Sequence, residues 1–340
     1  MMNFNILLFM SLMIISILLG LNANSMMFFW MSIEINMMSF VPMILFLNKN
    51  FNDSSMKYFL IQSLSSSLML FFILNLMNKF ISIMFMFVFF SLLMKLGFFP
   101  FNFWYLNMLN NLSWINCLFL MTVQKILPFL MINYLFKLMN FNFYLNNNYF
   151  NIINLTIIFG AFMSISMIYS LNSIKLIMGM SSINHMSWML LILMINKKMF
   201  IFYFIIYSMI LFNLIYLLKY YNINFLNNLM LLNNKFLFKY MLFFLMMLIM
   251  SLPPLITFFM KSFTIYYYVK YNFMFMSYFL MIITIIMFFY YLKLFLTSMI
   301  FLNINLLINM NNNLIKYNMF MKFMFLNLMM IMLFYWIFNM

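Results

Sequence analysis

The chain has 340 residues, of which 69% are hydrophobic and 6% are charged, whereas a soluble domain is roughly a quarter charged. A fold with so little polar surface cannot cover its outside with groups that water solvates. The composition therefore excludes a soluble globular protein and predicts an integral membrane protein.

The charge is strongly unbalanced, with 17 basic residues against two acidic ones, Glu34 and Asp53. All of the basic residues are lysines, and they are scattered between apolar runs. A nucleic-acid partner needs a contiguous basic face, and recognition of a fixed phosphate usually recruits arginine. The pattern argues against nucleic-acid binding and is typical of loop charges that orient membrane helices.

Taken in chain order, the apolar runs predict a single all-α domain over residues 1–340, a polytopic membrane helix bundle. A spanning helix needs about 20 apolar residues, and on that criterion we expect about eleven crossings. They fall at residues 3–21, 26–47, 58–77, 80–106, 112–136, 150–170, 175–195, 199–218, 240–269, 273–297 and 319–339. Gly97 with Pro100 and Pro253 with Pro254 should break the fourth and ninth of these into discontinuous helices.

The connectors and the N-terminus give the expected orientation. Lysines in the connectors are more numerous on the side of the N-terminus, which predicts that this end faces the cytoplasm or matrix. The first apolar run has no basic residue before it and no small-residue cleavage site after it, so we expect no cleavable targeting signal. Cys117, the only cysteine, lies in an apolar run and is interpreted as a small buried hydrophobic residue.

Four charged residues fall deep inside the predicted spans, away from their ends: Glu34, Lys95, Lys125 and Lys261. A charge at the centre of a membrane helix costs about 2.5–3.5 kcal/mol, so such residues must face the bundle interior, pair or contact water. Burial favours the neutral form of each group and a nearby opposite charge favours the charged form. They are therefore candidate proton-transfer sites. A structural ion pair explains Glu34 and Lys95 equally well, and Lys261 can also reach an interface. Lys125 is too central to do so, which favours the proton-transfer interpretation for it.

His185 is the only histidine and lies among small polar residues in the middle of a predicted span. Histidine suits proton relay near neutral pH, but a hydrogen-bonded packing histidine is an equally good interpretation. A single histidine without clustered ligands argues against a metal site. Helix breakers beside Lys95 and Lys261 favour a hydrated path, because unwound backbone at membrane depth is tolerated where it lines a cavity.

Motifs for electron carriers and nucleotides are missing from the sequence. With 4 glycines and 1 cysteine, the chain has neither a phosphate-cradling loop nor the thiolates of an iron–sulfur cluster. We therefore expect no cofactor in this chain, and its chemistry would be proton movement.

Six segments, in order, resemble the family of subunit 2 of mitochondrial NADH:ubiquinone oxidoreductase, respiratory complex I. They are Trp30-x-x-x-Glu34-x-Asn36, Lys57-Tyr58-Phe59-x-x-Gln62, Lys95-x-Gly97-x-x-Pro100-Phe101, Thr122-x-Gln124-Lys125-x-x-Pro128, Ser181-Ser182-Ile183-Asn184-His185 and Leu252-Pro253-Pro254. Two places depart from the family pattern, since Met250-Ser251 and Ile256-Thr257 stand where the family usually has glycine.

The resemblance implies an antiporter-like membrane-arm subunit that moves protons while quinone is reduced elsewhere in the complex. It implies that Glu34 and Lys95 form a charge pair, that Lys125 is the central proton carrier, and that Lys261 lies toward the far half-channel. It leaves the role of His185 less defined.

The resemblance also implies the setting of the chain. NADH, FMN, iron–sulfur clusters and ubiquinone would bind other subunits, and the partners would be neighbouring membrane-arm subunits, supernumerary subunits and lipids such as cardiolipin. The location would be the mitochondrial inner membrane, with the N-terminus on the matrix side, which agrees with a composition typical of an AT-rich animal mitochondrial genome. Two alternatives share the same buried charges: a free-standing cation/proton antiporter and a purely structural assembly subunit.

Overall fold

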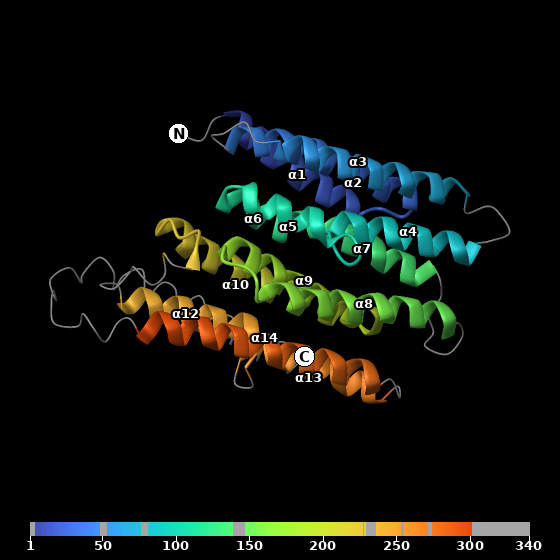
Figure 1. Cartoon of the computed structure of the whole chain (residues 1–340). Coiled ribbons are helices and arrows are strands. Elements are labelled where there is room, and N and C mark those ends of the chain that lie inside the picture. The colour runs from blue at the N-terminus through green and yellow to red at the C-terminus, as the bar shows by residue number, and fades with distance from the viewer. Residues whose placement is uncertain are drawn as a thin grey trace. The chain divides into compact units, whose positions relative to one another are not determined.

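The computed structural model of the chain describes residues 4–47, 53–75, 81–138, 147–226, 228, 236–252, 255–270 and 274–300. Its elements in this part of the chain are α-helices, joined by turns and by one isolated antiparallel bridge between Ser173 and Phe225 (Figure 1). The predicted all-α membrane bundle is confirmed. Eight helices within the described ranges are long and apolar enough to cross a membrane.

The chain divides into two compact units. Unit 1 comprises Met1–Ile168 with Lys175–Lys197, and unit 2 comprises Tyr169–Ile174 with Lys198–Met340. The chain thus returns once to unit 1, through one long helix, after a short excursion. The prediction of one domain over the whole chain stays a prediction.

Unit 1 contains nearly all the helices that carry the candidate residues. They are α1 (Phe4–Leu21), α2 (Met26–Leu47), α3 (Ser54–Leu74), α4 (Ile81–Leu96), α5 (Asn102–Asn111), α6 (Trp114–Met121), α7 (Val123–Leu138), α8 (Asn147–Ile168) and α9 (Ile174–Ile195). Helix α2 packs against α1, α3, α6 and α7, while α4 packs against α3 and α7. This packing brings the helices of Glu34, Lys95 and Lys125 together.

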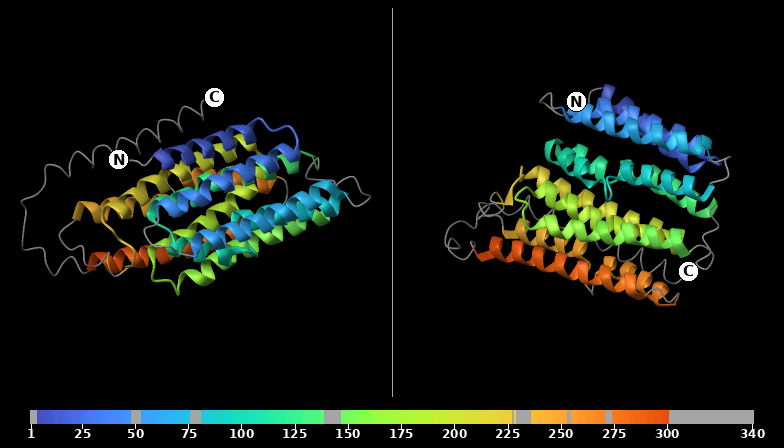
Figure 2. Two further views of the ribbon diagram at one scale, coloured as in Figure 1. Left: turned by 90° about the horizontal axis from the view of Figure 1, so that it is seen from above. Right: turned by 45° about the vertical axis from the view of Figure 1, so that its right-hand side comes forward.

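Unit 2 contains α10 (Lys197–Tyr220), α12 (Phe236–Met250), α13 (Ile256–Lys270) and α14 (Met274–Ile300). The last helix packs along both α12 and α13, and the views in Figure 2 agree that α14 runs beside each of them. Helix α14 therefore packs against both halves of the interrupted helix that α12 and α13 form. The predicted span 319–339 lies outside the described residues, as do Pro253 and Pro254.

One predicted span has a break that the sequence did not indicate. Residues 112–136 were expected to form one span, and the structure divides it, because α6 ends at Met121 and α7 begins at Val123. Thr122 between them has φ −121° and ψ −74°, outside the helical region. No break was predicted here, because neither glycine nor proline marks it. The two pieces together still make one candidate span, Trp114–Leu138.

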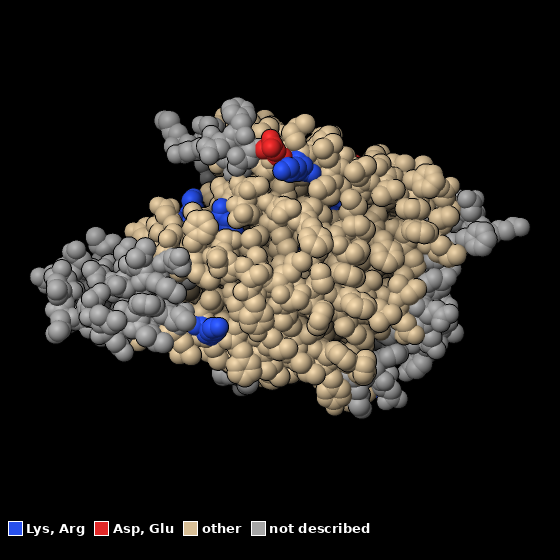
Figure 3. Space-filling model, viewed as in Figure 1, with Lys and Arg blue, Asp and Glu red and all other residues tan. Residues whose placement is uncertain are grey.

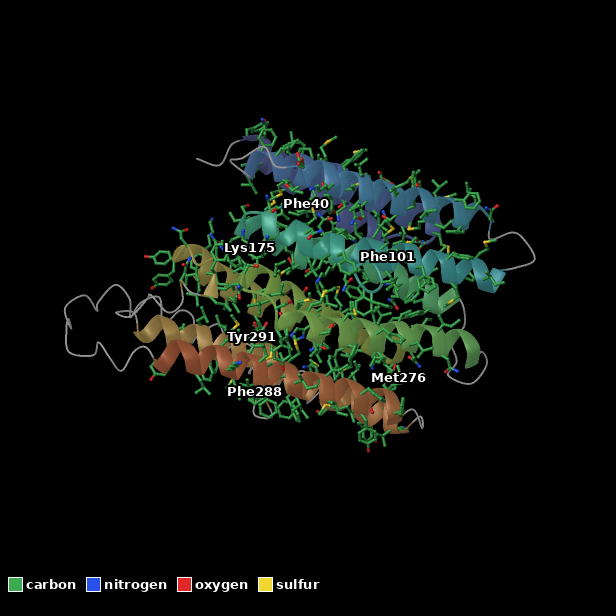
Figure 4. All side chains as sticks on the ribbon, viewed as in Figure 1. Phe40, Phe101, Lys175, Met276, Phe288 and Tyr291 are labelled. Atoms are coloured by element: carbon green, nitrogen blue, oxygen red, sulfur yellow. The ribbon has the colours of Figure 1, made fainter. Side chains whose placement is uncertain are left out.

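Large apolar side chains face outward over much of the fold, as a lipid-facing surface requires. Phe4, Phe28 and Phe71 are 78%, 62% and 58% exposed. On the face drawn in Figure 3 charged side chains are sparse and most of the surface is uncharged. Inside unit 1, the ring of Phe40, which Figure 4 labels, meets the ring of Tyr58 with centroids 5.2 Å apart. Cys117 is buried, in agreement with its interpretation as a small hydrophobic residue.

The serines inside the helices satisfy their hydroxyls locally. The hydroxyls of Ser32, Ser65 and Ser91 donate to the carbonyl oxygen three residues earlier, at 2.7 Å each. Such bonds remove the cost of an unpaired donor in a medium without water.

The degree of burial differs sharply between helices. In α1 the most apolar window has a mean hydropathy of 2.5 and is 17% buried, whereas in α9 the values are 1.4 and 94%. Helix α9 therefore has almost no face left for lipid.

Candidate functional site

Lys95 lies in the last turn of α4, at a helix end built by glycine. The amide of Gly97 donates to Met94 O at 3.2 Å and the amide of Phe98 donates to Leu93 O at 3.0 Å. With Gly97 at φ +66°, this is the Schellman arrangement that ends a helix through a left-handed glycine. The break predicted from Gly97 and Pro100 is therefore present, and Lys95 lies near the negative end of the helix dipole, which favours a cation.

Lys95 is 5% exposed, and its Nζ has no hydrogen-bond partner among the described residues. Glu34, half-buried on α2, acts on Lys95 through its charge. The two side chains implied to be a charge pair are thus electrostatic neighbours without a direct hydrogen bond. The backbone of Lys95 is held separately, since Gln62 Nε2 donates to Lys95 O at 3.3 Å.

Lys125 is the third residue of α7, just after the break at Thr122, and is 2% exposed. Thr122 stabilises the break itself, since its Oγ1 donates to Leu118 O at 2.7 Å. The amide of Lys125 donates to Thr122 O at 3.1 Å, so the chain re-enters the helix at this lysine. A second buried lysine therefore lies at an interrupted helix.

The aromatic ring of Tyr105 lies beside Lys125. Its Nζ lies 5.0 Å from the centroid of the Tyr105 ring, within the range of a cation–π interaction. The hydroxyl of Tyr105 shares a hydrogen bond of 2.7 Å with Ser182 Oγ on α9. Ser182 belongs to one of the six segments that resemble the family, whereas the sequence indicated no role for Tyr105, because an aromatic residue in an apolar helix carries no signal of its own.

An amide network beside Lys125 joins three helices. Asn36 Nδ2 donates to Gln124 Oε1 at 3.2 Å and Gln124 Nε2 donates back to Asn36 Oδ1 at 3.3 Å. The Tyr58 hydroxyl donates to the same Gln124 Oε1 at 3.1 Å. Asn36 and Tyr58 are 3% and 2% exposed. The network fixes the helix of Lys125 against α2, the helix that carries Glu34, and against α3.

His185 is 3% exposed on α9 and lies three residues after Ser182, on the same helix face. Its helix is thereby connected, through Ser182 and Tyr105, to the surroundings of Lys125. The serines nearby bond to their own helix, with Ser181 Oγ donating to Met178 O at 2.8 Å and Ser187 Oγ to Asn184 O at 2.6 Å. Unit 1 thus contains Glu34, Lys95, Lys125 and His185.

Lys261 lies in unit 2, on α13, and is 3% exposed. Its Nζ donates to Ser251 Oγ, at the turn that follows α12. Ser251 adopts φ 60° although it is not glycine, and its amide donates to Leu248 O at 3.3 Å. Thr257 Oγ1 donates to the same carbonyl at 2.6 Å. Lys261 is therefore hydrogen-bonded inside its unit at a third interrupted helix.

The side chains of the candidate residues can bind and release protons, and all of them except the half-buried Glu34 are buried in the protein. Ammonium, carboxylate, imidazole and hydroxyl groups are the side chains that serve as proton donors and acceptors in membrane pumps. At each break a side chain donates to a carbonyl of the preceding helix, so the interrupted backbone is satisfied within the protein.

Comparisons with known proteins agree with one another. A family model described as NADH:quinone oxidoreductase/Mrp antiporter, transmembrane, matches residues 23–289. NADH-ubiquinone oxidoreductase chain 2 of Rhipicephalus sanguineus is 34% identical over 322 residues, which cover 92% of this chain and 97% of the relative. The protein of the same name from Anopheles gambiae is 33% identical over 301 residues, covering 84% and 83%.

Two solved structures share the fold. A chain of respiratory complex I from Thermus thermophilus has a TM-score of 0.77 at 17% identity, over 87% of this chain and 71% of that one. A chain of the Mrp complex from a Dietzia species has a TM-score of 0.70 at 11% identity, over 84% and 59%. At such identities the likeness concerns the fold alone.

Proposed function

Because this chain belongs to the NADH:quinone oxidoreductase/Mrp antiporter membrane family, we propose that its buried charges form a proton relay. The chain is a membrane-arm subunit of the proton-pumping NADH:ubiquinone oxidoreductase, a multi-pass protein that works beside other membrane-arm subunits. One observation carries the relay: three lysines are buried in apolar helices, and each lies at a helix interruption or bonds to one.

The relay begins at Glu34 and Lys95. Reduction of quinone in another part of the enzyme changes the charge near this pair, and the change alters how strongly Lys125 holds its proton. Lys125 then passes a proton toward Lys261 or takes one back. His185, on the helix that Tyr105 contacts, is included as a further proton-binding side chain. The coulombic action of Glu34 on Lys95 and the network from Asn36 to Gln124 support the first step.

The setting of the relay is part of the proposal. The chain lies in the mitochondrial inner membrane with its N-terminus on the matrix side, and animal relatives and the distribution of loop lysines support this. NADH, FMN, iron–sulfur clusters and ubiquinone bind other subunits. Exposed apolar side chains such as Phe28 and Phe71 contact supernumerary subunits and lipids such as cardiolipin.

Replacement of Lys125 tests the relay. In the assembled enzyme, reconstituted into vesicles, Lys125→Met should lower NADH-coupled proton output by about 10²-fold, the scale of a lost acid–base group. Proton uptake and NADH oxidation are measured together, because a blocked relay acts on either the ratio or the rate. Lys293→Met, an exposed lysine on α14, is the matched control and should leave both unchanged. Normal output and turnover in Lys125→Met would rule out the relay.

A further inference from the structure

Tyr105 contacts both Lys125 and helix α9, which carries His185. Its side chain is 1% exposed, the face of its ring lies 5.0 Å from Lys125 Nζ, and its hydroxyl is 2.7 Å from Ser182 Oγ. The contacts come from α5, α7 and α9, all in unit 1. The ring of Tyr105 thus lies between the ammonium group of Lys125 and helix α9.

The ring is fixed from its backbone side as well. A Cβ added to Gly97 would lie 2.5 Å from Tyr105 Cβ and 2.9 Å from its Cγ, so the glycine turn leaves no free space there. The hydroxyl bond to Ser182 holds the other end of the side chain. Since both ends are held, the ring presents a fixed face to the ammonium group.

The face of the Tyr105 ring offsets the unfavourable position of Lys125 in its helix. As the third residue of α7, Lys125 lies near the positive end of a helix dipole, where a cation is disfavoured. The face of an aromatic ring carries negative potential and attracts an ammonium group most strongly where water is excluded. The ring therefore stabilises the charged form of Lys125 at a place where the backbone does not.

We propose that Tyr105 is a positioning residue for Lys125, whose ring face stabilises the ammonium form and whose bond to Ser182 couples that stabilisation to α9. The inference rests on the proposed function of Lys125 as a proton carrier. A movement of α9 at Ser182 tilts the ring and changes how strongly Lys125 holds its proton. In this way a change at His185, one turn away, reaches Lys125 through Ser182 and Tyr105.

Other ionisable groups near Lys125 must be kept constant in a test. The helices packed against α7 carry Glu34 on α2, Lys95 on α4 and Cys117 on α6, while α1 carries none. Tyr58 on α3 bonds to Gln124 of α7, and helix α9 adds His185. A change at Tyr105 leaves all five in place, so its effect on the pH profile reports on the ring.

The experiment compares Tyr105→Leu, Tyr105→Phe and Ser182→Ala in the assembled enzyme, with proton output per NADH followed over a pH series. Tyr105→Leu removes the ring, and the alkaline limb of the profile should move to lower pH by about one unit. Tyr105→Phe and Ser182→Ala each keep the ring and lose the same hydrogen bond, so their shifts should be smaller and equal. If Tyr105→Leu does not assemble, these two variants still decide the matter.

Tyr203→Leu is the matched control, because Tyr203 is 2% exposed on α10 in unit 2. It should lower stability as a lost buried tyrosine does and leave the pH profile in place. Wild-type profiles in all three test variants, with Lys125→Met inactive, would overturn the inference alone. Normal pumping in Lys125→Met would instead overturn the proposed function on which it rests.

Discussion

The turn between α4 and α5 and the turn between α12 and α13 each interrupt a membrane helix beside a buried lysine. In both, a side chain from the following helix donates to a carbonyl in the last turn of the helix before it. Trp104 Nε1 reaches Met94 O at 3.0 Å, and Thr257 Oγ1 reaches Leu248 O at 2.6 Å. In both units, a carbonyl group at the end of an interrupted helix is therefore satisfied by a side chain of the helix that follows.

The two turns differ at the left-handed residue and in the way the lysine is held. The first has Gly97 at φ +66° and the second has Ser251 at φ 60°. Lys95 precedes its break and is acted on by the charge of Glu34, whereas Lys261 follows its break and donates to Ser251 Oγ. The backbone of a broken helix and the surroundings of its lysine are therefore separable, and each can be changed without the other.

The largest effect is expected at the first turn, from Gly97→Ala. The new Cβ would meet Tyr105 at 2.5 Å, and an alanine at positive φ is strained. Together these should cost about 2–4 kcal/mol of stability. Thermal unfolding of the purified enzyme and its yield measure the loss. A variant as stable as the wild type would show that Tyr105 is not packed against this turn.

At the second turn, Ser251→Ala and Ser251→Gly should rank in a definite order. Both remove the hydroxyl that accepts from Lys261, at a cost of about 1–3 kcal/mol. Glycine also relieves the left-handed backbone, so it should be less damaging than alanine by about 1 kcal/mol. Thermal stability of the two variants gives the order directly. The reverse order would mean that the turn carries no strain, and the contrast with Gly97 would disappear.

The smallest effect is expected from Thr257→Val, which keeps the shape of the side chain and loses the bond to Leu248 O. The cost should be about 1 kcal/mol. Thr257→Ser retains the hydroxyl and serves as its control, with stability close to that of the wild type. Equal stability of the two variants would show that the freed carbonyl of α12 is satisfied in another way.

The sequence predicted most of the helices because length and hydropathy alone identify a membrane span. The predicted spans 3–21 and 26–47 match α1 and α2 within a residue. The break at Gly97 was predictable because glycine and proline carry a physical preference that sequence displays. The break at Thr122 was not predictable. The threonine hydroxyl there donates to a carbonyl of its own helix, and any threonine in a helix can form such a bond.

The candidate site was predictable only in part, for a related reason. Charged residues in apolar runs are conspicuous, so Glu34, Lys95, Lys125 and Lys261 were singled out from burial cost alone, and their roles in proton transfer stay predictions. The residues around them could not be predicted, because Tyr105 and Gln124 belong to the site only through the contacts that they make in the fold. Ser251 was noted as a departure from glycine, yet its bond to Lys261 depends on a turn that sequence does not display.

The burial of α9 has a consequence for how the protein is made. Its polar side chains, among them His185 and Asn184, are enclosed by protein in the finished fold. During synthesis the same helix enters a bilayer, where those groups lack partners and are costly. Helix α1, apolar and lipid-facing, bears no such cost. Insertion of α9 is therefore expected to require that helices synthesised earlier are already in the membrane and can contact it. The order of synthesis would then help a polar helix to reach the interior of the fold.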